Sequence, residues 1–228
     1  LRREAIDFAK RTTDIAQYME AELMVYWPAQ DGYDYPFQAD HRKRLDDLVK
    51  GLAEWADYNP DQRVVVEYKA FEPRTHIMLP TIGHCMTVIN EIDRPNLGIN
   101  IDVGHGLIMK ENIAESIALC CRYGKLFHTH WNDNWKMFDD DIIVGTVNLW
   151  ETLEALFWLE EWGYDGWFGL DLFPYREPPE KVVDETIKMI KFGYELLDRV
   201  EREELRQCFT TSDAIKITQL MRQMLGGS

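Results

Sequence analysis

The sequence lacks the features that mark several classes of protein. It contains no run of about 18 apolar residues, so we predict no segment that crosses a membrane. Its first residues, Leu1 to Ile6, have no apolar core of the kind found in a signal peptide. Only four cysteines occur, with neither a CxxC pair nor dense spacing. We therefore expect free, mostly buried thiols and a cytoplasmic protein.

Positive charge is also scarce. The chain has 25 Lys and Arg against 40 Asp and Glu, which gives a formal net charge of −15. A surface of this sign repels a phosphate backbone, so we predict no nucleic-acid partner. The 228 residues are enough to bury one large core.

What the sequence does contain is a regular alternation of strand and helix patterns. Apolar, β-branched runs predict strands over 23–27, 63–69, 98–104, 126–132 and 167–173. Apolar residues at helical spacing predict helices over 1–20, 41–58, 76–92, 111–123, 149–162, 180–201 and 213–225. This alternation is typical of the α/β class with a parallel sheet. We expect one such domain over residues 1–205 and a helical tail over residues 206–228.

Each predicted strand ends in side chains suited to chemistry. These are Trp27, Glu67, Lys69, Asp102, His105, His130 and Asp171. Each alone has an ordinary explanation, such as an ion pair, a turn cap or a loop histidine. In a parallel β/α barrel, however, the C-terminal ends of all strands meet at one mouth, where active sites lie. Five successive polar strand ends therefore predict one convergent site.

The segment 126–141 is the richest of these. Its chemistry-bearing side chains are His128, His130, Asn132, Asp139, Asp140 and Asp141. Because side chains alternate along a strand, the two histidines and the asparagine share one face. Imidazoles and carboxylates without thiolates favour Mg, Mn, Co or Zn. On composition alone, the alternative is a polar strand end followed by an acidic surface loop.

Grouped by strand end, these ligands predict two neighbouring metal sites. The first would consist of Glu67, Asp102, His130 and Asp171. The second would consist of a bridging Asp102 with His105, Asp139 and Asp141. Two such ions can clamp a polyhydroxylated substrate. Lys69 could polarise a carbonyl oxygen, and Trp27 would provide an aromatic wall.

Five motifs resemble those of the xylose isomerase-like sugar isomerases. They are Glu67-Tyr-Lys69-Ala-Phe-Glu-Pro-Arg74, Asn100-Ile-Asp102-Val-Gly-His105, Phe127-His-Thr-His130-Trp-Asn-Asp133, Phe138-Asp139-Asp-Asp141 and Leu170-Asp171-Leu-Phe-Pro174. The first motif, together with His130, is most similar to the L-rhamnose isomerase branch. Xylose isomerases proper usually have aspartate at the position of His130.

The resemblance implies a fold, an activity and cofactors. The fold is an eight-stranded (β/α)8 TIM barrel. The activity is aldose–ketose isomerisation of a monosaccharide by a 1,2-hydride shift, with catalytic roles for Lys69, His105 and Asp141. Substrate contacts would come from Trp27, Lys69 and His105. The cofactors are two divalent ions, manganese first, with cobalt, magnesium or zinc also compatible. Barrel isomerases of this type are usually dimers or tetramers, so we expect a homo-oligomer.

The main departure from the family is the number of strands. The motifs match strands four to eight of the barrel, and the first three have no counterpart. A whole barrel takes about 250 residues. We therefore expect an incomplete barrel of about five parallel strands with two open edges, and a fragment of a longer chain.

Other functions stay open at this stage. A keto-sugar 3-epimerase or hydroxypyruvate isomerase would use one metal and two glutamates that move a proton through an enediolate. Asp171 in place of a glutamate, together with Lys69 and the Asp139/Asp141 pair, favours the hydride shift instead. A second alternative is a catalytically inactive, truncated barrel that retains the ligands. A related endonuclease for abasic DNA would need a basic groove, which the net charge disfavours.

Overall fold

The computed structural model of the chain describes residues 1–227. Its centre is a five-stranded parallel sheet, whose strands follow the order β1-β3-β6-β7-β8. The strands are β1 (Leu23–Tyr26), β3 (Arg63–Glu67), β6 (Leu97–Asp102), β7 (Leu126–Trp131) and β8 (Phe168–Leu170). Together with its helices the sheet forms a curled half-barrel, which confirms the predicted incomplete (β/α)8 fold.

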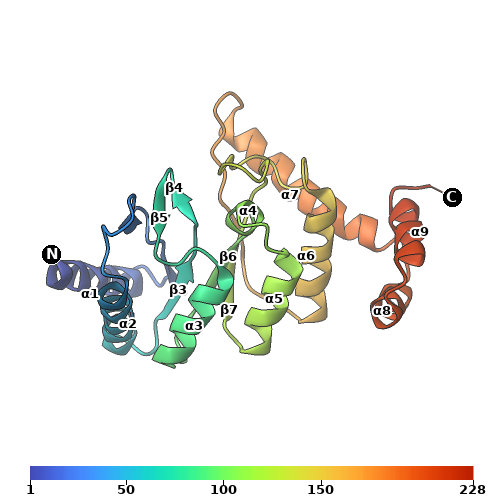
Figure 1. Cartoon of the computed structure of the whole chain (residues 1–228). Helices are drawn as coiled ribbons and strands as arrows, with labels where there is room; N and C mark the ends of the chain where they lie inside the picture. The colour runs from blue at the N-terminus through green and yellow to red at the C-terminus, as the bar shows by residue number, and fades with distance from the viewer. Residues whose placement is uncertain (228) are drawn as a thin grey trace.

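The helices follow one another across the molecule in chain order (Figure 1). They are α1 (Arg2–Tyr18), α2 (His41–Tyr58), α3 (Ile82–Ile92), α4 (Val103–Ile108), α5 (Ile113–Arg122), α6 (Leu149–Glu161) and α7 (Pro179–Leu197). Two further helices, α8 (Arg202–Thr211) and α9 (Ala214–Met224), lie at the C-terminal end. The sequence predicted one helix through residue 201, whereas α7 ends at Leu197 and α8 is separate.

Alternate residues of each strand belong to the core between sheet and helices. In β3, Val64 and Val66 are buried in one cluster with Leu52 of α2 and Ile89 of α3. Because side chains alternate along a strand, Glu67 points to the opposite face, the interior of the half-barrel. The apolar pattern that packs the helices thus also decides which polar side chains face inward.

A small antiparallel sheet was not predicted. It consists of β2 (Gly32–Tyr33), β5 (Thr75–Ile77) and β4 (Phe71–Glu72), in that order. The predicted helix over 76–92 is therefore wrong in its first turns. The helix begins only at Ile82, after Thr81, whose side chain accepts a hydrogen bond from the N–H of His84.

Two predictions from the sequence concern membrane-spanning segments and the state of the cysteines. Within residues 1–227, no helix has both the length and the apolar character that crossing a bilayer requires. All four cysteines are free; Cys85, Cys120 and Cys208 are buried and Cys121 is half-buried. The prediction of free, mostly buried thiols is confirmed.

Candidate metal centre

The four residues of the first predicted set surround one point inside the half-barrel. Glu67 ends β3, Asp102 ends β6, His130 lies in β7 and Asp171 follows β8. One donor atom of each lies within 4.8 Å of the others. The Nδ1 atom of His130 is 3.2 Å from Glu67 Oε2, 3.2 Å from Asp171 Oδ2 and 3.8 Å from Asp102 Oδ2. The parallel register places Asp102 directly beside His130.

These groups are crowded and mostly buried, and their acid–base behaviour reflects this. Burial raises the pKa of the Asp102 carboxyl to about 6, even with His105 beside it. Burial alone would lower the pKa of His130, but the carboxylates of Asp171 and Glu67 outweigh it and raise that pKa to about 10. Without a metal, protons must offset the charge of the carboxylates. A divalent cation would take over that role and release the protons.

Within residues 1–227, several buried side-chain nitrogen and oxygen atoms in this region have no hydrogen-bond partner. They include Nδ1 of His105 and Oδ1 of Asp139, and Nδ1 of His130 has only its ion-pair contacts with the carboxylates. Such atoms are costly to bury unless they are satisfied, and a metal ion would satisfy them. The donor set of oxygen and imidazole nitrogen, without sulfur, fits Mn, Mg, Co or Zn. The residues present therefore fit a divalent ion.

The second predicted set comes together only in part. His105 Nε2 lies 3.1 Å from Asp139 Oδ2, and His105 Nδ1 lies 3.8 Å from Asp102 Oδ1. Burial alone would lower the pKa of His105, but Asp102 and Asp139 raise it to about 9. Burial, with the charges of Asp139 and Asp102, raises the pKa of Asp141 to about 8. Within residues 1–227, only the first set gathers its donor atoms within 4.8 Å.

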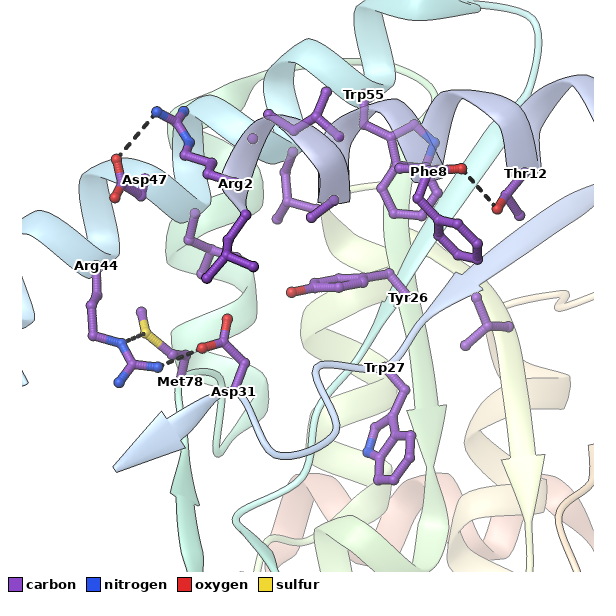
Figure 2. A pocket seen from close by; sticks show the side chains of 18 residues that line it. Arg2, Phe8, Thr12, Tyr26, Trp27, Asp31, Arg44, Asp47, Trp55 and Met78 are labelled. Atoms are coloured by element: carbon purple, nitrogen blue, oxygen red, sulfur yellow. Dashed lines mark hydrogen bonds and ion pairs between the residues drawn. The ribbon is translucent and has the colours of Figure 1, made fainter. Parts of the chain in front are cut away.

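Lys69 lies beside the second set. Its Nζ atom is 2.7 Å from Asp139 Oδ2 and 2.5 Å from Glu72 Oε2, and the side chain is almost fully buried. The same atom lies 5.3 Å from the centre of the Trp27 ring. Figure 2 shows the Trp27 ring turned away from that of Tyr26. Lys69 follows β3 and Trp27 follows β1, so both lie beside the second set; their predicted contacts with a substrate stay a prediction.

Two other side chains of the segment 126–141, His128 and Asp140, lie outside the ligand cluster. The ring of His128 packs edge-on against His130, with ring centres 5.1 Å apart. Burial, with the charge of His130, lowers the pKa of His128 to about 4. Its ring nitrogens are not among the donor atoms that gather within 4.8 Å. Asp140 accepts a hydrogen bond from the N–H of Trp135 and belongs to the loop rather than to the site.

Two buried amides hold the ligands, and sequence reasoning gave neither of them a role. Asn100 Nδ2 donates to Glu67 Oε2 at 2.9 Å. Asn132 Nδ2 donates to both carboxylate oxygens of Asp102, at 3.2 Å each. The signal that could have found them is spacing, since Asn100 lies two residues before Asp102 and Asn132 two residues after His130.

A separate cavity of about 850 Å³ lies between α1, α2 and the edge strand β1 (Figure 2). Its lining is mostly apolar, with an ion pair between Arg44 and Asp31 at 2.5 Å and another between Arg2 and Asp47 at 3.3 Å. Trp27 is part of its lining, whereas the predicted metal ligands are not. This cavity is therefore distinct from the candidate metal centre.

The fold is similar to that of a known protein family and of several solved structures. Residues 1–192 match the family described as xylose isomerase-like TIM barrel. Among solved structures, a D-tagatose 3-epimerase-like protein is 23% identical with a TM-score of 0.65, and the match covers 83% of this chain and 71% of that chain. A 3-keto-D-glucoside 4-epimerase from E. coli is 16% identical with a TM-score of 0.68, covering 82% and 70% respectively.

A third structure, an L-ribulose 3-epimerase, is 15% identical with a TM-score of 0.70, and the match covers 85% of this chain and 68% of that chain. At these identities the similarity concerns the fold. In each case about a third of the other protein has no counterpart in this chain. The family match extends over most of the residues and includes every strand that contributes to the metal centre. The chain belongs to the xylose isomerase-like TIM barrel family.

Proposed function

We propose that this chain carries the metal centre of a sugar epimerase or isomerase. The observation that carries the proposal is the convergence of Glu67, Asp102, His130 and Asp171 around one point at the strand ends of a xylose isomerase-like fold. A divalent ion bound there would polarise neighbouring carbonyl and hydroxyl oxygens of a sugar. Imidazole and carboxylates would hold the ion, and the remaining side chains would orient the substrate and move protons.

Epimerisation at C3 of a keto sugar is the reaction we put first. Two of the three structures described above bear 3-epimerase names, and this reaction requires two acid–base groups that face the same carbon. Glu67 and Asp171 could fill these roles, because both reach His130 Nδ1 at 3.2 Å from strands that are not neighbours. Glu67 would remove the C3 proton, and Asp171, whose side chain is 49% exposed, would return one from the other side.

Aldose–ketose isomerisation by a hydride shift is a second candidate, favoured by the position of Lys69. Its ammonium group is held beside Asp139 and Glu72, where it could donate to a substrate carbonyl oxygen. A second ion held by Asp102, His105, Asp139 and Asp141 would assist that reaction. Asp171 is also one methylene shorter than glutamate, which weakens its reach as a proton shuttle.

Turnover of keto sugars and aldoses in deuterated water, with Mn²⁺ present, separates these reactions. Proton transfer places solvent deuterium at C3 of the epimerised product. A hydride shift gives an aldose or ketose without solvent deuterium at C1 or C2. Mn²⁺ binding without turnover of any sugar would support an inactive barrel that retains its ligands. Absence of Mn²⁺ binding would show that the proposed metal centre is wrong.

A further inference from the structure

The loop after β7 supplies two predicted ligands without any regular secondary structure of its own. Three large side chains in it, Trp135, Met137 and Phe138, are exposed, so its tip is not fixed by core packing. Asp139, in contrast, has a side chain only 11% exposed and lies against His105 and Lys69. The carboxylate is thus held by these two side chains, and the loop that carries it is attached to the fold at its two ends.

The two ends of the loop are joined by backbone hydrogen bonds. The N–H of Asp133 donates to the carbonyl of Ile142 at 3.0 Å, and the N–H of Ile142 donates back at 3.1 Å. Asn134 Nδ2 donates to the carbonyl of Gly104 in α4 at 2.9 Å. The segment between them, which contains Asp139 and Asp141, therefore leaves and rejoins the fold at one place.

The carboxylate of Asp133 lies at this junction. The residue is 1% exposed, and among residues 1–227 it forms no ion pair with a basic side chain. Its Oδ1 accepts from Asn134 N at 2.8 Å and Asn148 Nδ2 at 2.6 Å. Its Oδ2 accepts from Val147 N at 2.8 Å and Asn148 N at 3.0 Å. One buried anion thus receives four hydrogen bonds from both ends of the segment 134–148.

The same carboxylate ties the loop to a helix. Asn148 is the N-cap of α6, yet its own side chain makes no capping hydrogen bond. The Asp133 carboxylate instead binds the N–H groups of Val147 and Asn148 just before the helix. A negative charge is favourable there because the helix dipole is positive at its N-terminus. The carboxylate of Asp133 therefore fixes the position of the loop relative to α6, which is a packed and rigid element.

We propose that Asp133 is a positioning residue that holds the segment 134–142 so that Asp139 and Asp141 face the metal centre. Asp133 does not touch Lys69 or His105, and it acts through the loop. An asparagine at position 133 would turn an amide N–H₂ toward two N–H donors and lose half of the four bonds. This inference rests on the second ion site, which belongs to the second candidate function, the hydride shift.

The test compares the wild-type chain with Asp133→Asn and with Asn112→Ala as a matched control. Asn112 caps α5 by accepting from Glu115 N at 2.8 Å, away from the loop. Mn²⁺ binding is followed by calorimetry and by electron paramagnetic resonance, and loop opening by hydrogen exchange of residues 135–141 in the metal-free protein. In the wild type we expect two ions with a spin-coupled signal.

In Asp133→Asn we expect the second ion to bind roughly 10- to 100-fold more weakly, with the spin-coupled signal lost. The first ion should bind within about twofold of the wild type, and loop amides should exchange about tenfold faster or more. Asn112→Ala should lower the melting temperature without changing either ion or the loop. If Asp133→Asn does not fold, Asn148→Ala removes only the Nδ2 bonds and should show the same changes to a smaller degree.

Two results would overturn the inference. One is unchanged loop exchange in Asp133→Asn and Asn148→Ala, and the other is wild-type affinity for both ions in these variants. Binding of a single ion by the wild type would instead contradict the second site of the proposed function. In that case, hydrogen exchange of the loop amides in the metal-free protein still decides whether Asp133 holds the loop in place.

Discussion

At the scale of single residues, Asp171 offers the clearest test of the metal centre. Its side chain is 49% exposed, whereas Asp102 is fully buried and its replacement would disturb folding. We predict that Asp171→Asn weakens Mn²⁺ binding by about tenfold or more, measured by calorimetry. Replacing a residue that only supports a metal ligand typically lowers metal affinity by about 10- to 100-fold, and replacing the ligand itself should lower it at least as much. The melting temperature of the metal-free protein should change little. Asp184→Asn, on the exposed face of α7, is the control and should bind Mn²⁺ normally.

Lys69 should matter for stability as well as for chemistry. It is buried between Glu72 and Asp139, so Lys69→Met would leave the Glu72 carboxylate without its cation and the Asp139 carboxylate with His105 alone. We predict a loss of unfolding free energy on the order of 3 kcal/mol in urea denaturation of the metal-free protein. Sugar turnover should also fall, whereas Mn²⁺ binding at the first set should persist. Unchanged sugar turnover would show that Lys69 takes no part in the reaction.

The first ligand set could be predicted from the sequence, and its supporting residues could not. Parallel strands align their C-terminal ends, so acids and imidazoles at those ends must converge once the strand order is right. Asn100 and Asn132 carry no charge; strand alternation placed Asn132 on the face of the histidines, but it did not show that either amide holds a ligand. Asp133 was only the last residue of one motif, and no pattern assigned it a role. Its role depends on Val147 and Asn148, about 15 residues further along, and no local pattern reports that contact.

At the scale of elements, the start of α4 is the most tightly constrained junction. Asp102 caps this helix by accepting from His105 N at 2.9 Å, and Gly104 follows it closely. A Cβ atom at position 104 would lie 2.1 Å from Asn132 Oδ1, which is too close for any real contact. The glycine is therefore needed so that Asn132 can reach Asp102.

We predict that Gly104→Ala lowers the unfolding free energy by about 1–3 kcal/mol and weakens Mn²⁺ binding, because Asn132 must move away from Asp102. Urea denaturation and calorimetry would measure the two effects. Gly51→Ala in α2 is the control, since nothing lies within 4 Å of its added Cβ. That variant should gain about 0.5–1 kcal/mol and bind Mn²⁺ normally. Equal behaviour of the two variants would contradict the role given to Gly104.

Long elements were easier to predict than short ones. The helix α2 begins and ends where the apolar spacing indicated, at His41 and Tyr58. The strands β2 and β4 have two residues each, too few to show alternation, and they form only because β5 pairs with both. The strand β8 also ends earlier than expected, at Leu170, which leaves Asp171 just beyond the ladder rather than within it.

At the scale of the whole molecule, the order of the five strands followed from the alternation of patterns, but the degree of curl did not. The indole N–H of Trp167, just before β8, donates to Glu22 Oε2 just before β1, at 2.9 Å. The first and last strands of the sheet thus approach each other at their N-terminal ends without pairing. Twist accumulated over four strand pairs produces this shape, and single residues do not encode it.

The charge of the metal centre should govern how stability changes with pH. The folded-state pKa values of His130 and His105 are raised to about 10 and about 9, above their ordinary 6.5. Their contribution to the free energy of unfolding is therefore complete below about pH 6.5 and is lost as the pH rises toward 9 to 10. The raised pKa of Asp141, about 8, acts in the same direction, because its folded form also retains a proton that the unfolded form releases. Asp139, with a pKa lowered to about 2, matters only in strong acid.

We therefore predict that the metal-free chain melts at a lower temperature at pH 9 than at pH 6. A divalent ion replaces the bound protons, so Mg²⁺ should raise the melting temperature more at pH 9 than at pH 6. Scanning calorimetry with chelator or with Mg²⁺ at both pH values measures this. The overall negative charge also grows with pH, and repeating the scans in about 0.5 M NaCl screens that surface effect but affects the buried cluster little. A metal-free protein equally stable at both pH values in high salt would show that the clustered carboxylates and imidazoles do not share protons as the structure implies.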